Sequence, residues 1–527
     1  MNYSRNILLI LALALTIAAS PRELRADTDT KAIDDIAART MALYSVPGMA
    51  VGVIKDNRVI FERGYGIREL GKKGQIDSET LFKIGSNSKA FTTAALAILV
   101  DEGKLNWDDK VIDHIPGFRL YDPWVTREFT VADLLTHRSG LTPHAGDMML
   151  WPEPNAFTRA DILHNLRYFE PASSFRSKYA YDNLFYIIAG ELIPAITGQS
   201  WGEFVDERIF GALEADRCIA GHMSKRDMKN IAAPHGVIEG KLQVIERSRI
   251  VSEPNTSAAA GGIRCSLQDM LTWVQVQLNR GATRTGDELF SAEQSDAMWR
   301  AITVLGVGGK AADRDRTHFR AYGLGWRLAD VHGYREVSHT GSLSGWHSYA
   351  VLIPEMQLGA VVLTNGSGGK ARRAMMYSII RPYLGIDDVD WIEYIENEDK
   401  EDDQPELTAV MEAPMLCDTC ETGRVLATLD TYAGVYRDRW FGDITVTLDG
   451  DGLLIAAEKS PRLVGRLEPY LGNTFIARWT DRSIEGDAYV TFSGDTPDTI
   501  DRILMRAVSS DSDFEFHDMK LMRVVED

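Results

Sequence analysis

Cysteine is scarce in this chain, which has only four in 527 residues. That number is too small for a fold held together by disulfide bonds. Two of the four form the isolated motif Cys417-Asp418-Thr419-Cys420. A structural zinc site would need a second pair of ligands at a suitable spacing, and none follows. We therefore expect a local disulfide or two free thiols there, without a metal or redox role.

Positive charge is also in short supply. Lysine and arginine total 57, against 76 aspartate and glutamate residues, which gives a net charge of -19. Such an excess of negative charge disfavours nucleic acids and anionic membrane surfaces as partners. The zinc-protease motif His-Glu-x-x-His is absent from the sequence as well. We therefore expect no nucleic-acid partner and no metal site of that type.

An apolar run long enough to span a bilayer is absent from the sequence. Arg5 precedes the apolar run 7–19, and small and polar residues follow it. This order is typical of a secretory signal peptide, and the run is too short for a membrane-spanning helix. We place the cleavage site between about Ala18 and Ala26. The mature protein is thus expected to be periplasmic or secreted, with no stable membrane insertion after cleavage.

The length of the chain is enough for two or three domains. We expect a signal peptide over 1–26, a mixed domain over 27–395, an acidic linker over 396–424 and an all-β domain over 425–527. The linker follows from the acidic run 387–403, which is typical of a solvated linker or exposed helix. Short alternating strands and the hairpin turn Asp449-Gly450-Asp451-Gly452 indicate a small barrel or sandwich in the last domain.

The mixed domain has strand patterns at both ends and helical patterns between them. A strand–turn–strand pattern covers 47–69, and further strands are predicted over 322–328, 348–353 and 358–363. Helices are predicted after Ser86, after Thr130, after Asn183, over 270–278 behind a Ser266 cap, and over 372–383. This order favours an α+β fold, in which one antiparallel sheet is built from both ends of the domain and a helical lobe is inserted.

The most informative motif is Ser86-Asn87-Ser88-Lys89, which precedes an apolar, helix-prone run. Residues three apart lie on one face of a helix, so the hydroxyl of Ser86 and the amine of Lys89 would lie side by side. A serine hydroxyl becomes a nucleophile when a neighbouring base takes its proton. A second Ser-x-x-Lys match, Ser367 to Lys370, falls in a Gly-rich turn where nothing would hold the two side chains together.

A phenol and a carboxamide lie close together in Tyr181-Asp182-Asn183, just before an apolar helix. A nearby lysine ammonium can favour the phenolate of Tyr181, which could then act as a general base. Asn183 could donate a hydrogen bond to a substrate carbonyl. Taken alone, the segment is better explained by a half-buried tyrosine and an asparagine helix cap.

A third polar motif, His339-Thr340-Gly341-Ser342, follows a strand-like segment. Gly341 permits close approach to the backbone, and the N–H of Ser342 could help to form an oxyanion hole. Thr340 offers a hydroxyl, and His339 could shuttle a proton or donate a hydrogen bond. Taken alone, the segment resembles a polar edge strand with a glycine bulge.

The three motifs occur in this order along the chain, and together they resemble those of the serine β-lactamase and penicillin-binding-protein superfamily. The tyrosine of the middle motif points to the branch related to class C β-lactamases. Three further stretches resemble that branch: Leu134–Leu141, Ala260–Ile263 and Tyr322–Trp326. The whole resemblance covers roughly residues 30 to 385. The tail from about Leu429 resembles the lipocalin-like β-domains that some serine hydrolases and D-aminopeptidases carry.

The resemblance implies acyl transfer through an ester on Ser86. Lys89 and Tyr181 would share the removal of its proton, and Asn183 would orient the substrate. The N–H groups of Ser86 and Ser342 would form the oxyanion hole. No metal and no organic cofactor is implied.

The third motif departs from that of the β-lactamases, which usually carry lysine where this chain has His339. Histidine there is typical of D-Ala-D-Ala-type peptidases, other peptidases and some esterases. A mostly neutral histidine is also a weaker anchor for a substrate carboxylate. Arg264, Arg138 and Arg176 are candidates for that task.

Four functions follow from these observations. The first is an exported serine peptidase for short or unusual peptides, which include D-residue, cell-wall and linearised cyclic peptides such as linear microcystin. The others are a carboxylesterase, a β-lactamase and a non-catalytic sensor or binding protein. The last is disfavoured because Ser86, Lys89, Tyr181 and Asn183 are all present. In each case the ligand is a small molecule or a short peptide, and the β-domain could gate the cleft, bind wall material or mediate assembly.

Overall fold

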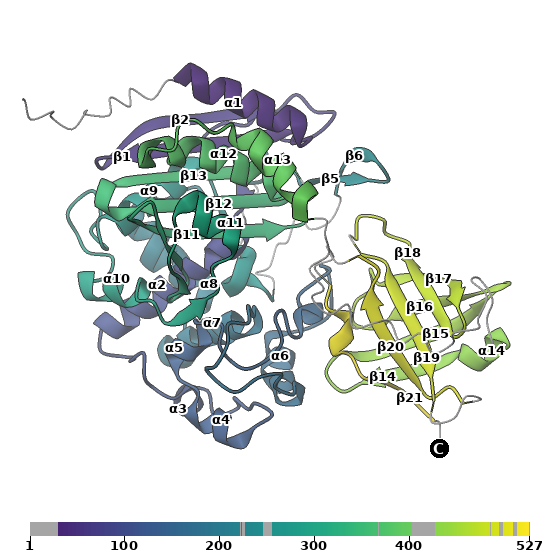
Figure 1. Ribbon diagram of the computed structural model, residues 1–527. Coiled ribbons are helices and arrows are strands. Elements are labelled where there is room, and N and C mark those ends of the chain that lie inside the picture. Colours follow the sequence, from purple (N-terminus) through teal and green to yellow (C-terminus); the bar gives the residue numbers. More distant parts are fainter. Residues whose placement is uncertain are drawn as a thin grey trace, which may run out of the picture.

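The computed structural model describes residues 30–221, 223, 227–245, 256–366, 368–402, 427–484, 486–494, 499–509 and 514–525. The expected signal peptide, the Cys417–Cys420 motif and Ser367 lie outside these residues. Two folded units follow one another along the chain, a mixed sheet-and-helix domain and a closed β-barrel (Figure 1). Within the described ranges, every helix is too short or too polar to cross a bilayer.

An eight-stranded sheet forms the centre of the first domain, in the order β2-β1-β13-β12-β11-β10-β9-β8. Its strands are β1 (Gly48–Lys55), β2 (Arg58–Gly66), β8 (Thr303–Leu305), β9 (Arg320–Tyr322), β10 (Arg327–Val331), β11 (Tyr334–Leu343), β12 (Trp346–Ile353) and β13 (Leu358–Thr364). The first strand pairs antiparallel with the last, with Ala50 opposite Leu363. The expected α+β architecture, with one antiparallel sheet built from both ends of the domain, is therefore confirmed.

Helices cover both faces of this sheet, and alternation along β1 explains why. Ala50 and Ile54 join the core with helix α9 (Leu267–Leu278), while Val51 and Val53 join the core with α12 (Lys370–Ile380). Successive side chains of a strand point to opposite faces, so a strand that is apolar throughout is buried on both sides. Each fully buried side chain of this size contributes about 1.5–3 kcal/mol of transfer free energy.

The inserted lobe is mostly helical. Its helices are α2 (Ser88–Asp101), α3 (Val111–His114), α4 (Pro123–Glu128), α5 (Val131–Leu134), α6 (Arg159–Asn165), α7 (Leu184–Thr197) and α8 (Trp201–Val205). Helix α2 is buried almost along its whole length. Helices α1 (Thr30–Leu43), α10 (Ala292–Met298), α11 (Gly309–Asp315) and α13 (Trp391–Asp402) complete the domain, together with the hairpin β5 (His235–Ile238) and β6 (Lys241–Val244).

Three predicted elements differ from the structure. The strand expected over 322–328 is interrupted, because β9 ends at Tyr322 and β10 begins at Arg327, with Gly325 at φ +79° in the turn between them. Helix α9 begins at Leu267, since the Ser266 side chain accepts a hydrogen bond from the N–H of Asp269. Helix α13 continues to Asp402, within the stretch that was expected to be linker.

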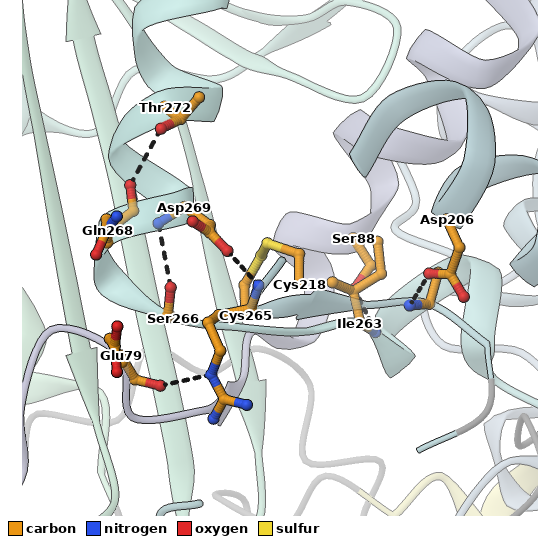
Figure 2. The surroundings of a disulfide bond; sticks show 12 residues. Glu79, Ser88, Asp206, Cys218, Ile263, Cys265, Ser266, Gln268, Asp269 and Thr272 are labelled. Atoms are coloured by element: carbon orange, nitrogen blue, oxygen red, sulfur yellow. Dashed lines mark hydrogen bonds between the residues drawn. A yellow bond between two sulfur atoms is a disulfide. The ribbon is translucent and has the colours of Figure 1, made fainter. Parts of the chain in front are cut away.

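A disulfide bond, which the sequence did not indicate, joins Cys218 to Cys265. These residues lie opposite each other in β4 (Cys218–Ile219) and β7 (Arg264–Cys265), and β3 (Phe82–Lys83) pairs with the other edge of β7. Figure 2 shows the bond beside Ser266 and Asp269, where α9 begins. Because β3 directly precedes Ser86, the bond reinforces the small sheet that leads into the first motif.

The second domain is a closed eight-stranded barrel, as expected from its short alternating strands. Helix α14 (Leu429–Tyr432) precedes β14 (Gly434–Asp438), β15 (Gly442–Asp449), β16 (Gly452–Ala457), β17 (Val464–Leu471), β18 (Thr474–Trp479), β19 (Ala488–Ser493), β20 (Arg502–Ala507) and β21 (Leu521–Arg523). Pairing of β14 with β21 closes the barrel. The predicted turn connects β15 to β16, with Asp449 opposite Gly452.

The barrel packs against the helical lobe near α6 (Figure 1). The side-chain amide of Asn165 donates to the carbonyl oxygen of Trp440 at 2.8 Å. The Trp440 ring contacts that of Phe169, with centroids 5.0 Å apart. Lys459 of the barrel forms an ion pair with Asp161 at 3.1 Å. Apolar and polar contacts therefore join the two domains.

Candidate active site

Two glycines hold the turn that carries Ser86 against strand β11. Ser86 lies in one turn of 3₁₀ helix, Gly85–Asn87, which continues directly into α2. Gly85 has φ +54°, and a Cβ atom there would come within 2.8 Å of the Ser342 nitrogen. A Cβ atom on Gly341 would lie 1.9 Å from the carbonyl oxygen of Ile84. Only residues without a side chain allow this contact, which brings the backbone of Ser86 and Ser342 together.

Lys89 lies beneath Ser86 and is fully buried. Its Nζ is 3.1 Å from the Ser86 Oγ, 2.7 Å from the Asn183 Oδ1 and 2.9 Å from the carbonyl oxygen of Ala260. Burial lowers the pKa of Lys89 to about 7, although the carboxylates of Asp147 and Asp182 act in the opposite direction. A substantial share of this amine is therefore neutral near pH 7 and able to accept a proton from Ser86.

Tyr181 lies beside both residues, but its protonation differs from the sequence-based expectation. Burial raises the pKa of the Tyr181 phenol, and a hydrogen bond with Ser86 only partly opposes this rise. The Nζ of Lys89 lies over the face of the ring, 4.8 Å from its centroid. The expectation that the lysine charge would favour the phenolate is therefore wrong, and Tyr181 is a neutral phenol near neutral pH.

Asn183 connects Lys89 to a carboxylate that the motifs did not include. Its Oδ1 accepts from Lys89, and its Nδ2 donates to the Asp147 Oδ2 at 2.8 Å. The Nδ1 of His144 is 2.9 Å from the same oxygen. The amide of Asn183 is thus oriented by the protein from both ends. No local pattern around residue 147 pointed to Asp147, because its partners are distant in sequence.

His339 is buried and neutral. Its Nδ1 lies 2.7 Å from the Thr340 carbonyl oxygen, so this nitrogen carries the proton, and its Nε2 accepts from the hydroxyl of Tyr322 at 2.8 Å. Burial lowers the pKa of His339 well below its ordinary value, and Arg327 and Lys89 lower it further. The imidazole therefore has no free nitrogen for a proton shuttle and carries no charge for a carboxylate.

Thr340 and Ser342 of the third motif differ in their exposure. The Thr340 side chain is half-buried and lines the cavity, whereas Ser342 is exposed at the end of β11. Arg372 of α12 donates to the carbonyl oxygen of Gly341 and to the Ser342 Oγ. These contacts fix the end of β11 and leave the Ser342 N–H beside the Ser86 turn.

A cavity of about 310 Å³ opens over these groups. Its lining is Ser86, His144, Asp147, Trp151, Tyr179, Tyr181, Asn183, Arg327, His339, Thr340, Ser342, Leu343, Ser344 and Phe514. Ser86, Tyr181, Asn183, His339, Thr340 and Ser342 from the sequence motifs meet here, while Lys89 lies behind them and Gly341 packs against the Ser86 turn. The volume is that of a site for a small ligand.

The arginines suggested as carboxylate anchors lie elsewhere. Arg138 and Arg176 both pair with the buried Asp133, at 3.2 Å and 2.5 Å. Arg264 is buried in β7 and does not line the cavity. Arg327 does line it, with its guanidinium carbon 5.9 Å from the ring centroids of Tyr179, Tyr181 and Tyr322. In the sequence, its position directly after the Tyr322–Trp326 stretch was the feature that could have identified Arg327 as a site residue.

His137 lies outside the three motifs but within the Leu134–Leu141 stretch that resembles the family. It adopts φ +53° and is buried. Its ring centroid lies 4.2 Å from that of Tyr181, and its Nδ1 accepts from the N–H of Asp182 at 3.1 Å. Burial lowers the pKa of His137 well below its ordinary value. It therefore supports the Tyr181 ring as a neutral packing group.

Comparison with known proteins agrees with this arrangement. Residues 33–383 match the family model described as Beta-lactamase, and residues 425–523 match a domain of unknown function, DUF3471. A structure described as that of the octameric penicillin-binding protein homologue from Pyrococcus abyssi aligns with a TM-score of 0.59 at 20% identity, over 94% of this chain and all of that one.

Three curated relatives are 26–27% identical to this chain. The unguisins hydrolase ungD of Aspergillus violaceofuscus is 27% identical over 79% of this chain and 76% of its own length. The corresponding protein ungD' of Aspergillus campestris is 27% identical over 70% of this chain and 69% of its own length. Protein flp of Staphylococcus aureus is 26% identical, and the match spans 62% of it. Because the Beta-lactamase model matches residues 33–383, more than half of the chain, the chain belongs to the beta-lactamase family, in the superfamily of serine β-lactamases and penicillin-binding proteins, a family of serine-hydrolase type.

Proposed function

We propose that this protein is an exported serine hydrolase that cleaves amide bonds of short or unusual peptides through an acyl-enzyme on Ser86. The observation that carries the proposal is the 3.1 Å contact between the Ser86 Oγ and the Nζ of the buried Lys89, whose pKa is lowered to about 7. A buried amine that is partly neutral is a suitable base for an adjacent hydroxyl.

The proton moves in two stages. The Lys89 amine takes the Ser86 proton as Oγ bonds to the substrate carbonyl carbon, and the carbonyl oxygen becomes an oxyanion that the N–H groups of Ser86 and Ser342 stabilise. The Tyr181 hydroxyl then gives a proton to the leaving amine as the C–N bond breaks, and Lys89 reprotonates the phenolate. In the second half of the reaction, water attacks the ester carbonyl carbon while the Lys89 amine takes its proton. The C–Oγ bond then breaks, Lys89 returns the proton to the Ser86 Oγ, and the acid product leaves. Asn183 holds Lys89 in place throughout.

The cavity favours a substrate with a free carboxylate. Among its lining residues, all within the described ranges, Arg327 is the only lysine or arginine. A guanidinium recognises a carboxylate with two parallel hydrogen bonds. The neutral His339 offers no competing charge. A peptide that ends near the scissile bond would place its C-terminal carboxylate on Arg327, and D-residue, cell-wall and linearised cyclic peptides such as linear microcystin are candidates of this kind.

A carboxylesterase is the second candidate, because an ester needs the same nucleophile and base but a weaker acid for its leaving group. A β-lactamase is the third, and the absence of a lysine at position 339 disfavours it. The names of the two unguisins hydrolases support hydrolysis as the class of reaction and do not choose among these substrates.

The test compares the mature protein with Ser86→Ala. Both are incubated with short peptides bearing free or amidated C-termini, a p-nitrophenyl ester and a chromogenic cephalosporin, and the acyl-enzyme is followed by intact mass. Ser367→Ala, in the second Ser-x-x-Lys match, is the matched control and should behave as the wild type. Turnover that survives Ser86→Ala would refute the mechanism. Ester turnover without peptide cleavage would favour the esterase, and efficient cephalosporin hydrolysis the β-lactamase.

A further inference from the structure

One end of the β-barrel reaches the cavity over Ser86. Phe514, which lies between β20 and β21, lines this cavity together with Ser86 and Tyr181. Its ring contacts that of Phe516, with centroids 5.9 Å apart, and Phe516 is in turn 6.1 Å from Trp479 inside the barrel. Phe514 is only 8% exposed. It is therefore a wall of the cavity that is anchored in the barrel core.

A carboxylate of the same barrel segment holds a loop of the helical lobe. The Asp518 Oδ1 accepts from the Thr142 hydroxyl at 3.3 Å, and its Oδ2 accepts from the N–H of Gly146 at 3.4 Å. Gly146 adopts φ +71°, a conformation that few other residues accept at low cost. The loop is tied to the first domain as well, because the N–H of His144 donates to the Tyr181 carbonyl oxygen at 2.7 Å.

This loop leads directly into the group that orients Lys89. Gly146 precedes Asp147, whose Oδ2 accepts from the Asn183 amide at 2.8 Å, and the Asn183 Oδ1 accepts from Lys89 at 2.7 Å. Asp518 is thus linked to the proposed base through its 3.4 Å hydrogen bond from Gly146, one covalent step and two short hydrogen bonds. Displacement of residues 142–146 would change the direction of the Asn183 amide and hence the position of the Lys89 amine.

We propose that the β-barrel completes the active site, with Phe514 limiting substrate size and Asp518 acting as a positioning residue for Asp147, Asn183 and Lys89. The inference rests on the proposed acyl-enzyme chemistry at Ser86 and adds a role for the second domain. It makes the barrel part of the substrate specificity of the enzyme, so that short substrates enter and bulkier ones are excluded by Phe514.

The test uses the full-length chain with Phe514→Ala, Asp518→Asn and the control Lys520→Ala. Lys520 forms an exposed ion pair with Glu170 at 3.0 Å across the same interface and does not line the cavity. Ser86 is labelled with a small and a bulky aryl phosphonate, and the labelling rates are measured by intact mass. For Phe514→Ala we expect the ratio of the bulky to the small labelling rate to rise about tenfold, because loss of the ring makes room mainly for the bulky probe.

For Asp518→Asn we expect kcat for a small ester to fall about tenfold with little change in KM, because an amide nitrogen cannot accept from Gly146 or Thr142. We also expect the acid limb of its pH profile to move to lower pH, since Asp147 raises the pKa of Lys89 and would be displaced. If Asp518→Asn only weakened the contact between the two domains, it would lower the thermal stability and leave the acid limb at the same pH. Thermal unfolding of each variant, and Phe514→Leu as a smaller change, separate folding from positioning.

The inference is overturned if Phe514→Ala keeps the wild-type ratio of rates and Asp518→Asn keeps the kcat and pH profile of Lys520→Ala. Failure of the proposed function gives another pattern, in which the wild type shows no label on Ser86 and no turnover that depends on it.

Discussion

The base that activates Ser86 can be identified from the pH dependence of acylation. With a pKa of about 7 for Lys89, the neutral fraction of this amine is about 10% at pH 6 and about 90% at pH 8. The rate of acyl-enzyme formation should therefore rise about tenfold between these values, with a slope of one decade per pH unit on the acid side. Intact mass spectrometry of samples quenched at short times, from pH 5.5 to 9, measures this rate directly.

Three variants separate the candidate bases. Lys89→Met should lower acylation about 10²–10⁴-fold and abolish the acid limb, because the proton acceptor is removed. Tyr181→Phe should slow peptide cleavage by removing the acid for the leaving amine and leave the midpoint near pH 7. His339→Gln should also keep the midpoint, because burial keeps His339 neutral throughout this range.

Two results would refute this assignment. A rate that still rises steeply up to pH 9, with no midpoint near pH 7, would mean that the phenol of Tyr181, whose pKa burial raises, is the group that must lose its proton. A midpoint that moves in His339→Gln while Lys89→Met retains it would make the imidazole the base. Either outcome would contradict the assignment of Lys89 as the base, which depends on the lowering of its pKa by burial.

Three more predictions follow from the geometry. Arg327→Ala should raise KM about 10–100-fold for peptides with a free C-terminus, because that is the effect of losing one charged hydrogen-bonded contact. KM for C-terminal amides should stay unchanged in the same steady-state assay. Equal effects on both substrates would mean that the substrate carboxylate binds elsewhere. Gly341→Ala should lower both the stability of the protein and the rate of acylation, because its Cβ atom would lie 1.9 Å from the Ile84 oxygen. Thermal unfolding should show a loss of about 1–3 kcal/mol. A wild-type rate of acylation in this variant would contradict the packing of the Ser86 turn on β11. The double variant Cys218→Ser/Cys265→Ser should have a free energy of unfolding about 4 kcal/mol lower, because the bond closes a loop over a separation of 47 residues. Urea unfolding measures this change, and an unchanged urea midpoint would count against the bond.

Much of the fold could be predicted because its signals are local. The apolar strands at both ends of the first domain, the capped helices and the alternating strands after Leu429 each depend on neighbours within about ten residues. The antiparallel order then follows, because a domain that begins and ends with apolar strands buries them best side by side. The interrupted strand at Gly325 shows the limit, since its tight turn is defined by φ +79° and not by hydrophobicity.

The candidate site was only partly predictable for the same reason. Ser86, Lys89, Tyr181 and His339 belong to short motifs with recognisable spacing. Asp147, Arg327 and Phe514 have no such motif, because each acquires its place through contacts with residues far away in the chain. The Cys218–Cys265 bond was missed similarly, since only the pairing of β4 with β7 brings the two cysteines together.

Burial also decides what each group of the site can do, which the motifs alone did not reveal. The same dry surroundings lower the pKa of Lys89 to about 7, raise that of Tyr181 and keep His339 neutral. One group is thereby a base, one an acid and one a neutral structural element, although all three titrate in water. Because none of the three carries a permanent charge near pH 7, Arg327 is left to attract an anionic substrate. A substrate carboxylate on Arg327 would in turn favour the ammonium form of Lys89, so peptides with a free C-terminus should show an acid limb at higher pH than their amides.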